Sequence, residues 1–322
     1  MKVLLTGATG YIGGSVLTAL LESSHPRIKG AVITVPVRQQ QQADALAARG
    51  VVPVLFHGLD DTDALRGLAA GHDFVIHTAS GFHTGSAVAL ITGLVERKKN
   101  VDGVVHFVQV ELGRPTAQET SGTWNLAEAS RLDGDTSTHE FTDESDIFAL
   151  EKQLDAESVF SQRTTDLSVV TTAEVEGVKS YIIMPPDVYG FGTGLFNKHS
   201  LQIPELVSDA IKHGQAAYVG VGDGSGEVGH VHIRDLAALY EILLGKILDG
   251  VKCASGKDGI YFCNAGRHTW RDVATSIGTI GRRMGVLNSE VPASIGIEEA
   301  AQRWTGGDER YLRMGYCSQY VD

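Results

Sequence analysis

The chain lacks the features that mark several functional classes. It has only three cysteines (Cys253, Cys263 and Cys317), an odd number without metal-type spacing, so we expect reduced structural thiols. Positive charge is scarce: a net charge of -12 argues against nucleic-acid partners and against docking on anionic lipid. No apolar run reaches the roughly 18–20 residues that a membrane-spanning helix needs. We therefore expect a cytoplasmic protein that acts on a small molecule.

What the sequence has instead is an alternation of short apolar segments with segments of helical spacing. The expected strands are 3–6, 29–37, 51–56, 74–78, 104–110 and 180–184, and helices are expected at 15–23, 63–70, 86–98 and 147–161. This alternation predicts an α/β fold, a Rossmann-type doubly wound parallel sheet with crossover helices. Because the first residues already form a strand that enters a glycine loop, no signal peptide is expected.

The pattern changes after Met184. Pro185 and Pro186 end the last expected strand, glycine becomes frequent between 190 and 229, and the alternation fades. We therefore predict a dinucleotide-binding domain at 1–184 and a smaller substrate-binding part at 185–322. Some segments of the second part are expected to return to the first.

The first strand runs directly into a glycine loop. Such a turn brings the backbone against a pyrophosphate, where side chains would collide with the ligand, and the following helix offers free N–H groups and the positive end of its dipole. The spacing here is GxxGxxG, and the strand before and helix after it give the required context. A purely structural turn is the alternative. The predicted cofactor-binding residues of this loop are Gly7, Thr9, Gly10, Tyr11, Ile12 and Gly13.

The end of the second strand bears on the choice of cofactor. An acidic residue there would bind the ribose hydroxyls of NAD, whereas an arginine can pair with the 2′-phosphate of NADP. This chain has Arg38 at that place and no acid between it and Asp44. The sequence therefore favours NADP, with NAD left open and an ordinary surface arginine as the alternative.

Four motifs together resemble the extended and atypical branch of the short-chain dehydrogenase/reductases, the NAD-dependent epimerase/dehydratase-like family. They are the loop 6–13, His77-Thr78-Ala79-Ser80, Pro185-Pro186-Asp187-Val188-Tyr189-Gly190 and His230-Val231-His232-Ile233-Arg234-Asp235-Leu236. The resemblance implies that Thr78, Ala79 and Ser80 line the ribose–nicotinamide part of the cofactor. After the third strand the family tends to have Gly-Asp-Leu, but this chain has His57-Gly58-Leu59. Adenine contact is therefore expected from the Leu59 backbone or from a neighbouring acid.

The resemblance also implies a catalytic Tyr with a Lys four residues later on one helical face, plus a Ser or Thr. In that arrangement Lys lowers the pKa of the phenol and holds the ribose, while Tyr passes a proton to or from the substrate oxygen. No Tyr in this chain has such a Lys; the best match is Phe148 with Lys152, and Phe has no transferable proton.

Several explanations of Phe148 stay open. In the first, the protein is a natural variant whose chemistry does not need the hydroxyl. In the second, it has lost catalysis and kept cofactor binding. In the third, the tyrosine was deliberately replaced by phenylalanine. In a further interpretation Phe148 is a core residue and Lys152 a solvated lysine.

Three more features concern the substrate side. Ser121 matches the family's hydroxyl motif but follows an insertion at 111–120. It contacts the substrate oxygen, caps a helix, or does both. Tyr189 and Phe191 follow the strand 180–184 at the carboxyl edge, where open sheets bind ligands, and are the predicted substrate pocket. His230 and His232 are expected to point to opposite faces of an extended segment, and no metal site is predicted.

The predicted function is that of an NADP-dependent oxidoreductase or epimerase-like enzyme acting on a small organic carbonyl or alcohol. Lys152 and the Ser121 motif favour this interpretation. The missing tyrosine favours two others: a dinucleotide-binding sensor or interaction protein without catalysis, and a non-redox isomerase or lyase. A homodimer is left open.

Overall fold

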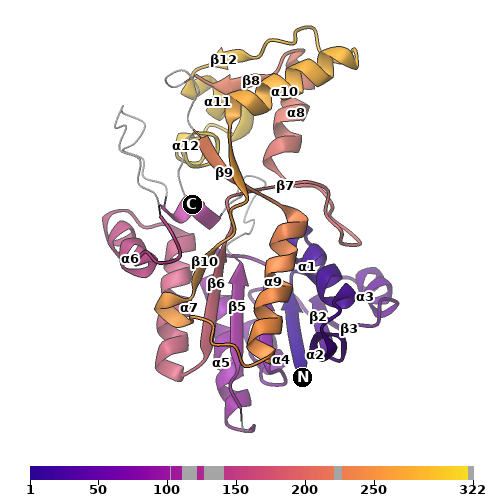
Figure 1. Ribbon diagram of the computed structural model, residues 1–322, viewed down its shortest axis with the longest axis vertical. Coiled ribbons are helices and arrows are strands. Elements are labelled where there is room, and N and C mark those ends of the chain that lie inside the picture. Colours follow the sequence, from indigo (N-terminus) through magenta and orange to yellow (C-terminus); the bar gives the residue numbers. More distant parts are fainter. Residues whose placement is uncertain (102, 111–121, 127–140, 221–226, 318–322) are drawn as a thin grey trace.

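The structure is a computed structural model that describes residues 1–101, 103–110, 122–126, 141–220 and 227–317. Its centre is a seven-stranded parallel sheet with the strand order β10-β6-β5-β4-β1-β2-β3 (Figure 1). The strands are β1 (Lys2–Thr6), β2 (Val32–Val37), β3 (Val52–Leu55), β4 (Phe74–His77), β5 (His106–Val110), β6 (Lys179–Met184) and β10 (Ile260–Phe262). The predicted Rossmann-type sheet is confirmed, and the six strands expected from the sequence are all present. Strand β10, which adds a seventh strand beside β6, was not expected from the sequence.

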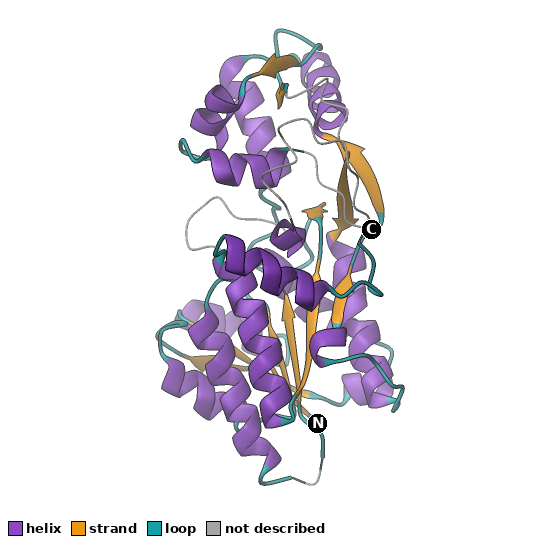
Figure 2. Cartoon of the chain, turned by 90° about the vertical axis from the view of Figure 1, so that its left-hand side faces the viewer, coloured by secondary structure: helices purple, strands orange, loops and turns teal. Residues whose placement is uncertain are grey.

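Helices cover both faces of this sheet, as Figures 1 and 2 show. Successive strand residues point to opposite faces, so in β1 Val3 and Leu5 join one core while Leu4 joins the other. Burial on both faces explains the continuous apolar runs of these strands. One face carries α1 (Tyr11–Glu22), α2 (Pro26–Lys29), α3 (Gln40–Ala47) and α9 (Ile233–Leu248), and the other carries α4 (Thr62–Ala69), α5 (Thr84–Lys98), α6 (Ile147–Glu157) and α7 (Ser161–Glu176).

The helical segment before β6 differs from the prediction. A single helix was expected over 147–161, but the chain forms α6, breaks at Ser158, and forms α7. The sequence of α7 is rich in Thr and Val, whose branched side chains lower helix propensity, so packing against α5 and the sheet decides its conformation. The helix ends at Gly177, which adopts a left-handed conformation with φ of 65°.

Beyond Met184 the chain builds two small sheets and a second group of helices. β9 (Glu227–His232) pairs in parallel with β7 (Asp187–Tyr189) and antiparallel with β11 (Gly266–Thr269), while β8 (Ala217–Val219) pairs with β12 (Ala293–Ile295). The helices are α8 (Gln202–His213), α10 (Trp270–Arg283), α11 (Ile297–Trp304) and α12 (Glu309–Tyr316), and the short 3-10 helices are η1 (Gly122–Leu126) and η3 (Gly256–Asp258). Figure 1 shows β9 reaching from the carboxyl edge of the central sheet toward these helices. This part of the chain also supplies β10 to the central sheet and α9 to its face.

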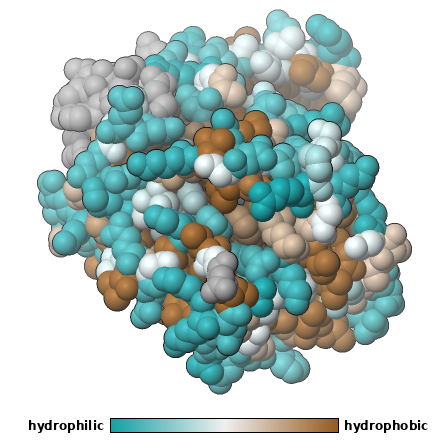
Figure 3. All heavy atoms as spheres, turned by 60° about the horizontal axis from the view of Figure 1, so that its bottom comes forward, coloured by the Kyte–Doolittle hydropathy of each residue, from teal (hydrophilic) through white to brown (hydrophobic). Residues whose placement is uncertain are grey.

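The surface is mixed in character. On the face shown in Figure 3, apolar side chains lie in small groups between hydrophilic ones, an arrangement that is ordinary for a globular surface. Within the described ranges, no helix combines the length and the hydropathy that crossing a bilayer requires.

Candidate functional site

The glycine loop lies between the end of β1 and the start of α1, pressed against the end of β4. Gly7 has φ of 79°, and a Cβ atom there would stand 2.6 Å from the carbonyl carbon of Thr78. A Cβ at Gly13 would collide with the Gly7 carbonyl oxygen and the Thr78 hydroxyl. Gly10 differs, because its Cβ position meets only the Gly7 carbonyl oxygen, at 3.2 Å. Packing therefore excludes a side chain at 7 and 13, while a Cβ at 10 would make a tight contact that a shift of a few tenths of an ångström would relieve.

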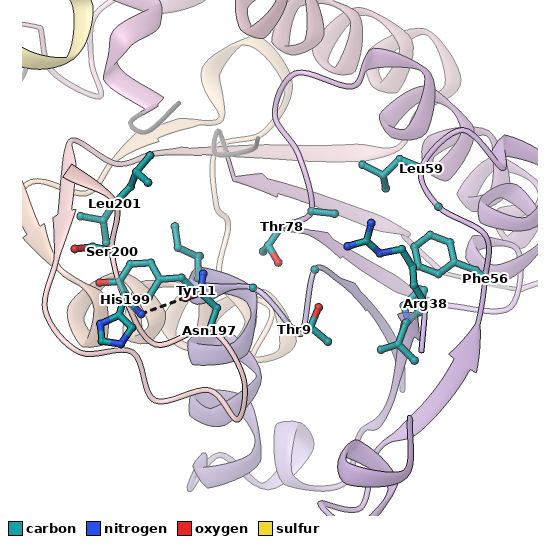
Figure 4. A pocket seen from close by; sticks show the side chains of 18 residues that line it. Thr9, Tyr11, Arg38, Phe56, Leu59, Thr78, Asn197, His199, Ser200 and Leu201 are labelled. Atoms are coloured by element: carbon teal, nitrogen blue, oxygen red, sulfur yellow. Dashed lines mark hydrogen bonds between the residues drawn. The ribbon is translucent and has the colours of Figure 1, made fainter. Parts of the chain in front are cut away.

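A cavity of about 400 Å³ opens over this loop (Figure 4). It brings together nine of the residues predicted to bind the cofactor: Gly7, Thr9, Gly10, Tyr11, Ile12, Arg38, Leu59, Thr78 and Ala79. Gly13 and Ser80 are not in its wall, and the Ser80 hydroxyl instead accepts a hydrogen bond from the backbone N–H of Phe82 at 3.1 Å. The cavity is elongated, with the glycine loop in the middle.

One end of the cavity is formed by Arg38, Phe56 and Leu59, which Figure 4 places on the side away from Tyr11. Arg38 comes directly after β2 and is exposed. No Asp or Glu occurs among the described residues that line the cavity. The acids that follow Leu59 bind elsewhere: Asp60 pairs with His83 at 3.0 Å, and Asp61 caps α4 by accepting from the N–H of Ala64 at 3.2 Å. This end of the cavity therefore carries a cation and apolar surface.

The other end of the cavity is formed by a segment that the sequence analysis did not assign to it, 190–201. This 190–201 segment supplies Asn197, His199, Ser200 and Leu201 to the wall. It is fixed to α1 through the Tyr11 hydroxyl, which donates to the Gly190 carbonyl oxygen at 2.9 Å.

Further contacts hold the 190–201 segment in place. The N–H of Thr193 donates to the Ser15 hydroxyl at 3.2 Å, and the hydroxyl of Thr18 donates to the Thr193 carbonyl oxygen at 3.1 Å. A Cβ at Gly194 would stand 2.8 Å from the Cα of Gly14. The glycine at 194 thus reflects the close approach of two backbones.

The predicted catalytic residues of α6 lie outside the cavity wall. Phe148 is half-buried and packs against the core beneath α4, α5 and α7, while Lys152 is exposed. This arrangement matches the interpretation of Phe148 as a core residue and Lys152 as a solvated lysine. No second candidate pair exists at the start of α7, where Phe160 caps the helix and Thr164 follows four residues later. Ser121 lies outside the described residues, and the catalytic roles of all three stay predictions.

A buried polar cluster connects η1, α6 and α7 with β5, and no sequence motif pointed to it. The amide of Asn125 donates to Glu151 Oε1 at 2.8 Å and to Asp166 Oδ2 at 2.7 Å, and Gln109 Nε2 donates to Asp166 Oδ1 at 3.1 Å. All four side chains are fully buried. Loss of hydration raises the pKa of Glu151 to about 8 and raises the pKa of Asp166 well above its ordinary value. Glu151 therefore holds a proton at neutral pH, and the cluster fixes the 3-10 helix that directly follows Ser121.

The predicted substrate residues lie after β6, outside the wall of the described cavity. Tyr189 is 38% exposed, and its ring contacts both His230 and His232, with centroids 5.4 and 5.3 Å away. Phe191 is 60% exposed and packs edge-on against His199. Contact with one ring shows that His230 and His232 face the same side, so the expectation of opposite faces was wrong: residues two apart on a strand share a face.

The part of the chain that the structure describes contains no group of three or more His, Cys, Asp or Glu side chains able to hold a metal ion.

The comparisons with known proteins fit the Rossmann-type sheet and its glycine loop. The sequence model of the NAD dependent epimerase/dehydratase family matches residues 3–253. The chain belongs to this family.

Relatives of known sequence or structure are distant. The oxidase ucsJ of Acremonium sp is 28% identical over 313 residues, which cover 93% of this chain and 84% of that protein. The structure of a DesIV double mutant, a dTDP-glucose 4,6-dehydratase from Streptomyces venezuelae with NAD and DAU bound, has a TM-score of 0.60 at 17% identity, covering 100% of this chain and 93% of that chain. The yeast methylglyoxal/isovaleraldehyde reductase Gre2, complexed with NADPH, has a TM-score of 0.57 at 15% identity, covering 100% and 90%. The two structural likenesses show a shared fold.

Proposed function

We propose that the chain is an NADP-dependent oxidoreductase that acts on a small organic carbonyl or alcohol. The observation that carries this proposal is the cavity in which Arg38 and the glycine loop face the same space, with no carboxylate among its described lining residues. A carboxylate at the end of the second strand would bind ribose hydroxyls and repel a 2′-phosphate, whereas a guanidinium pairs with that phosphate.

The shape and chemistry of the cavity fit a nicotinamide dinucleotide. The adenosine end would lie by Arg38, Phe56 and Leu59, with the 2′-phosphate on the Arg38 guanidinium. The pyrophosphate would lie over Gly10 at the start of α1, where free N–H groups and the helix dipole attract anions. When bound, the nicotinamide gives or takes a hydride; Thr78, Ala79 and Val188 would hold its ribose end.

Gly10 supports this placement independently of any family resemblance. Packing constrains this position less than 7 or 13, since the nearest contact of a Cβ there would be the Gly7 carbonyl oxygen at 3.2 Å, a tight distance that a small shift would relieve. The residue nevertheless lines the cavity at the first turn of α1. A ligand that approaches the backbone closely explains why the side chain is absent.

Both cofactors occur among the structural neighbours, one of which holds NADPH and another NAD. The preference for NADP therefore depends on Arg38. The activities of these neighbours, a methylglyoxal/isovaleraldehyde reductase and a dTDP-glucose 4,6-dehydratase, support a carbonyl or alcohol substrate without identifying it.

A dinucleotide-binding sensor without catalysis is the second candidate. The observation that favours it is the state of α6, where Phe148 offers no proton and Lys152 is exposed. The two candidates share the cofactor and differ in turnover.

The deciding experiment follows NADPH oxidation with a panel of aldehydes and ketones, with NADPH binding measured calorimetrically on the same sample. An oxidoreductase binds NADPH and oxidises it with at least one carbonyl of the panel. Binding without oxidation on a broad panel, in either reaction direction, would favour the sensor.

A further inference from the structure

We propose that Asp187, His268 and His230 form a proton relay whose outer residue, His230, protonates the oxygen of a carbonyl substrate. The proposal rests on the proposed reductase function and supplies the proton that Phe148 cannot give. The three residues come from the three neighbouring strands β7, β11 and β9, and Asp187 is the register partner of His230.

The three side chains follow one another in a line, with one hydrogen bond and one wider gap. Asp187 Oδ2 lies 3.9 Å from His268 Nε2, and His268 Nδ1 lies 3.0 Å from His230 Nδ1. The two imidazole rings are stacked, with centroids 5.2 Å apart and planes inclined by 28°. Because two Nδ1 atoms share one hydrogen bond, one ring donates and the other accepts, as a relay requires.

Packing alone does not account for the inner half of this line. Asp187 is 3% exposed, and among the described residues neither its Oδ2 atom nor His268 Nε2 has a hydrogen-bond partner. Buried polar atoms without partners destabilise a fold, so their retention points to a role. The atoms face each other across a gap that a contraction of about 1 Å or a single bridging water would close.

Burial sets the protonation of the line. It raises the pKa of Asp187 to about 7, lowers that of His268 to about 4, and lowers that of His230. Near neutral pH both rings are therefore uncharged, and the carboxyl group exchanges its proton in the range where enzymes work.

The groups around the relay come from four other elements and from its own strands. Tyr11 of α1 and Tyr316 of α12 lie near Asp187. Burial raises the pKa of each phenol, and the charge of Asp187 raises it further. Asp272 of α10 raises the pKa of His268, against the effects of burial and of His230. Glu205 of α8 accepts a hydrogen bond from the hydroxyl of Tyr316 at 2.7 Å. On the relay's own strands, His232 contacts the ring of Tyr189, and Arg267 pairs with Glu227 at 3.6 Å.

The relay lies at the edge where the cofactor cavity ends. β7 follows β6 at the carboxyl edge of the central sheet, and its middle residue, Val188, lines the cavity. Side chains alternate along a strand, so Asp187 and Tyr189 face the other side of β7. On that side Tyr189 and His230 are both partly exposed and in ring contact. Asp187 also lies close enough to Tyr11, which lines the cavity, for its charge to raise the pKa of that phenol.

The step balances with a reduced nicotinamide dinucleotide as the hydride source. The carbonyl carbon takes the hydride, the π pair of the C=O bond moves to oxygen, and that oxygen takes the Nε2 proton of His230. His230 Nδ1 then takes the Nδ1 proton of His268, and His268 Nε2 takes the proton of the Asp187 carboxyl. Asp187 is reprotonated from water. His230 is the catalytic residue in this scheme, and His268 and Asp187 act through it.

The test begins with a readout that needs no turnover. Side-chain NMR of the histidines is followed against pH in the wild type, Asp187→Asn and Asp249→Asn, with folding checked by thermal melts. Asp249→Asn is the matched control, because it also removes the carboxylate of a His–Asp pair, the one with His25 at 3.0 Å, outside the relay. We expect the His268 and His230 signals to shift as Asp187 titrates near pH 7 in the wild type and control, and not in Asp187→Asn. Histidine signals that change with pH in the same way in the wild type and in Asp187→Asn would overturn the relay.

The second readout is single-turnover oxidation of bound NADPH by a carbonyl. Asp187→Asn and His268→Asn should slow this step about 10²–10⁴-fold, the usual contribution of general acid catalysis, with NADPH affinity unchanged. The control should keep the wild-type rate and pH profile. Unchanged rates in the relay variants would overturn the relay as the proton source. If the wild type reduces no carbonyl, the proposed function fails, and the NMR titration still judges whether the three groups share protons.

Discussion

The hydroxyl of Tyr11 donates a hydrogen bond to the carbonyl oxygen of Gly190, 2.9 Å away and 179 residues further along the chain. The bond joins the first turn of α1 to the 190–201 segment, so the two ends of the cofactor cavity are built from distant parts of the sequence. Burial raises the pKa of the Tyr11 phenol above its ordinary value, so the donor stays protonated over the whole working range of pH.

Tyr11→Phe should loosen this connection. Loss of one neutral hydrogen bond typically costs about 0.5–1.5 kcal/mol of stability, and the freed 190–201 segment should weaken dinucleotide binding as well. The matched control is Tyr261→Phe, which removes a bond of the same kind, to the Ala254 carbonyl oxygen at 2.8 Å. Urea unfolding and calorimetric titration should show similar destabilisation in both variants and weaker binding only in Tyr11→Phe. Equal affinities in the two variants would mean that the segment is held without Tyr11.

Gly10→Val and Gly13→Val should fail in different ways. At 10 a side chain enters the space of the pyrophosphate, so the protein should fold but lose dinucleotide binding. At 13 it collides with the loop backbone, so the fold itself should suffer. Thermal melts and titration with NADPH distinguish the two. A folded Gly10→Val protein with unchanged affinity would remove this loop from the cofactor site.

Lys152→Ala should leave NADPH affinity unchanged, because the side chain is exposed and outside the cavity wall. Phe148→Tyr should likewise bring no gain in carbonyl reduction, since its ring packs against the core. If α6 were instead the catalytic helix of the family, the new phenol should raise the rate by about 10²–10⁴-fold. Lys152→Ala should then cancel that gain, and this pair of results would restore both residues to the site.

Stability should fall as pH rises because of Glu151. Its pKa is about 8 in the folded chain, above the ordinary value, so the folded state holds a proton that the unfolded state has already lost. The contribution is complete below the ordinary pKa and disappears as pH rises through about 8. Glu151→Gln keeps an acceptor for Asn125 and removes the titration. Urea unfolding from pH 5 to 9 should show a flatter profile in the variant; parallel profiles would contradict the raised pKa.

The sequence predicted the parts of the site that depend on short-range chemistry. Close contacts within the glycine loop and with the end of β4 require glycine at 7 and 13, so the loop was visible as a motif. Arg38 was visible because it directly follows its strand. Asn125, Glu151 and Asp166 were not, because each is ordinary in its local sequence and becomes distinctive only when η1, α6 and α7 pack together.

Tertiary packing explains the other differences. The Thr- and Val-rich sequence of α7 hides a helix that tertiary packing imposes, and the short β10 finds its place only beside β6. Asn197 and His199 reach the cavity because Gly192 and Gly194 allow the 190–201 segment to approach α1, a contact that no spacing rule contains.

The most direct test of the cofactor assignment compares NADPH and NADH by calorimetric titration of the wild type and Arg38→Ala. A charge-assisted contact to the 2′-phosphate is typically worth about 1.5–3 kcal/mol, or roughly ten- to over a hundred-fold in affinity. The wild type should therefore bind NADPH more tightly by about that factor, and Arg38→Ala should lose most of this preference while NADH affinity stays the same. Equal affinities for the two cofactors in the wild type would contradict the account.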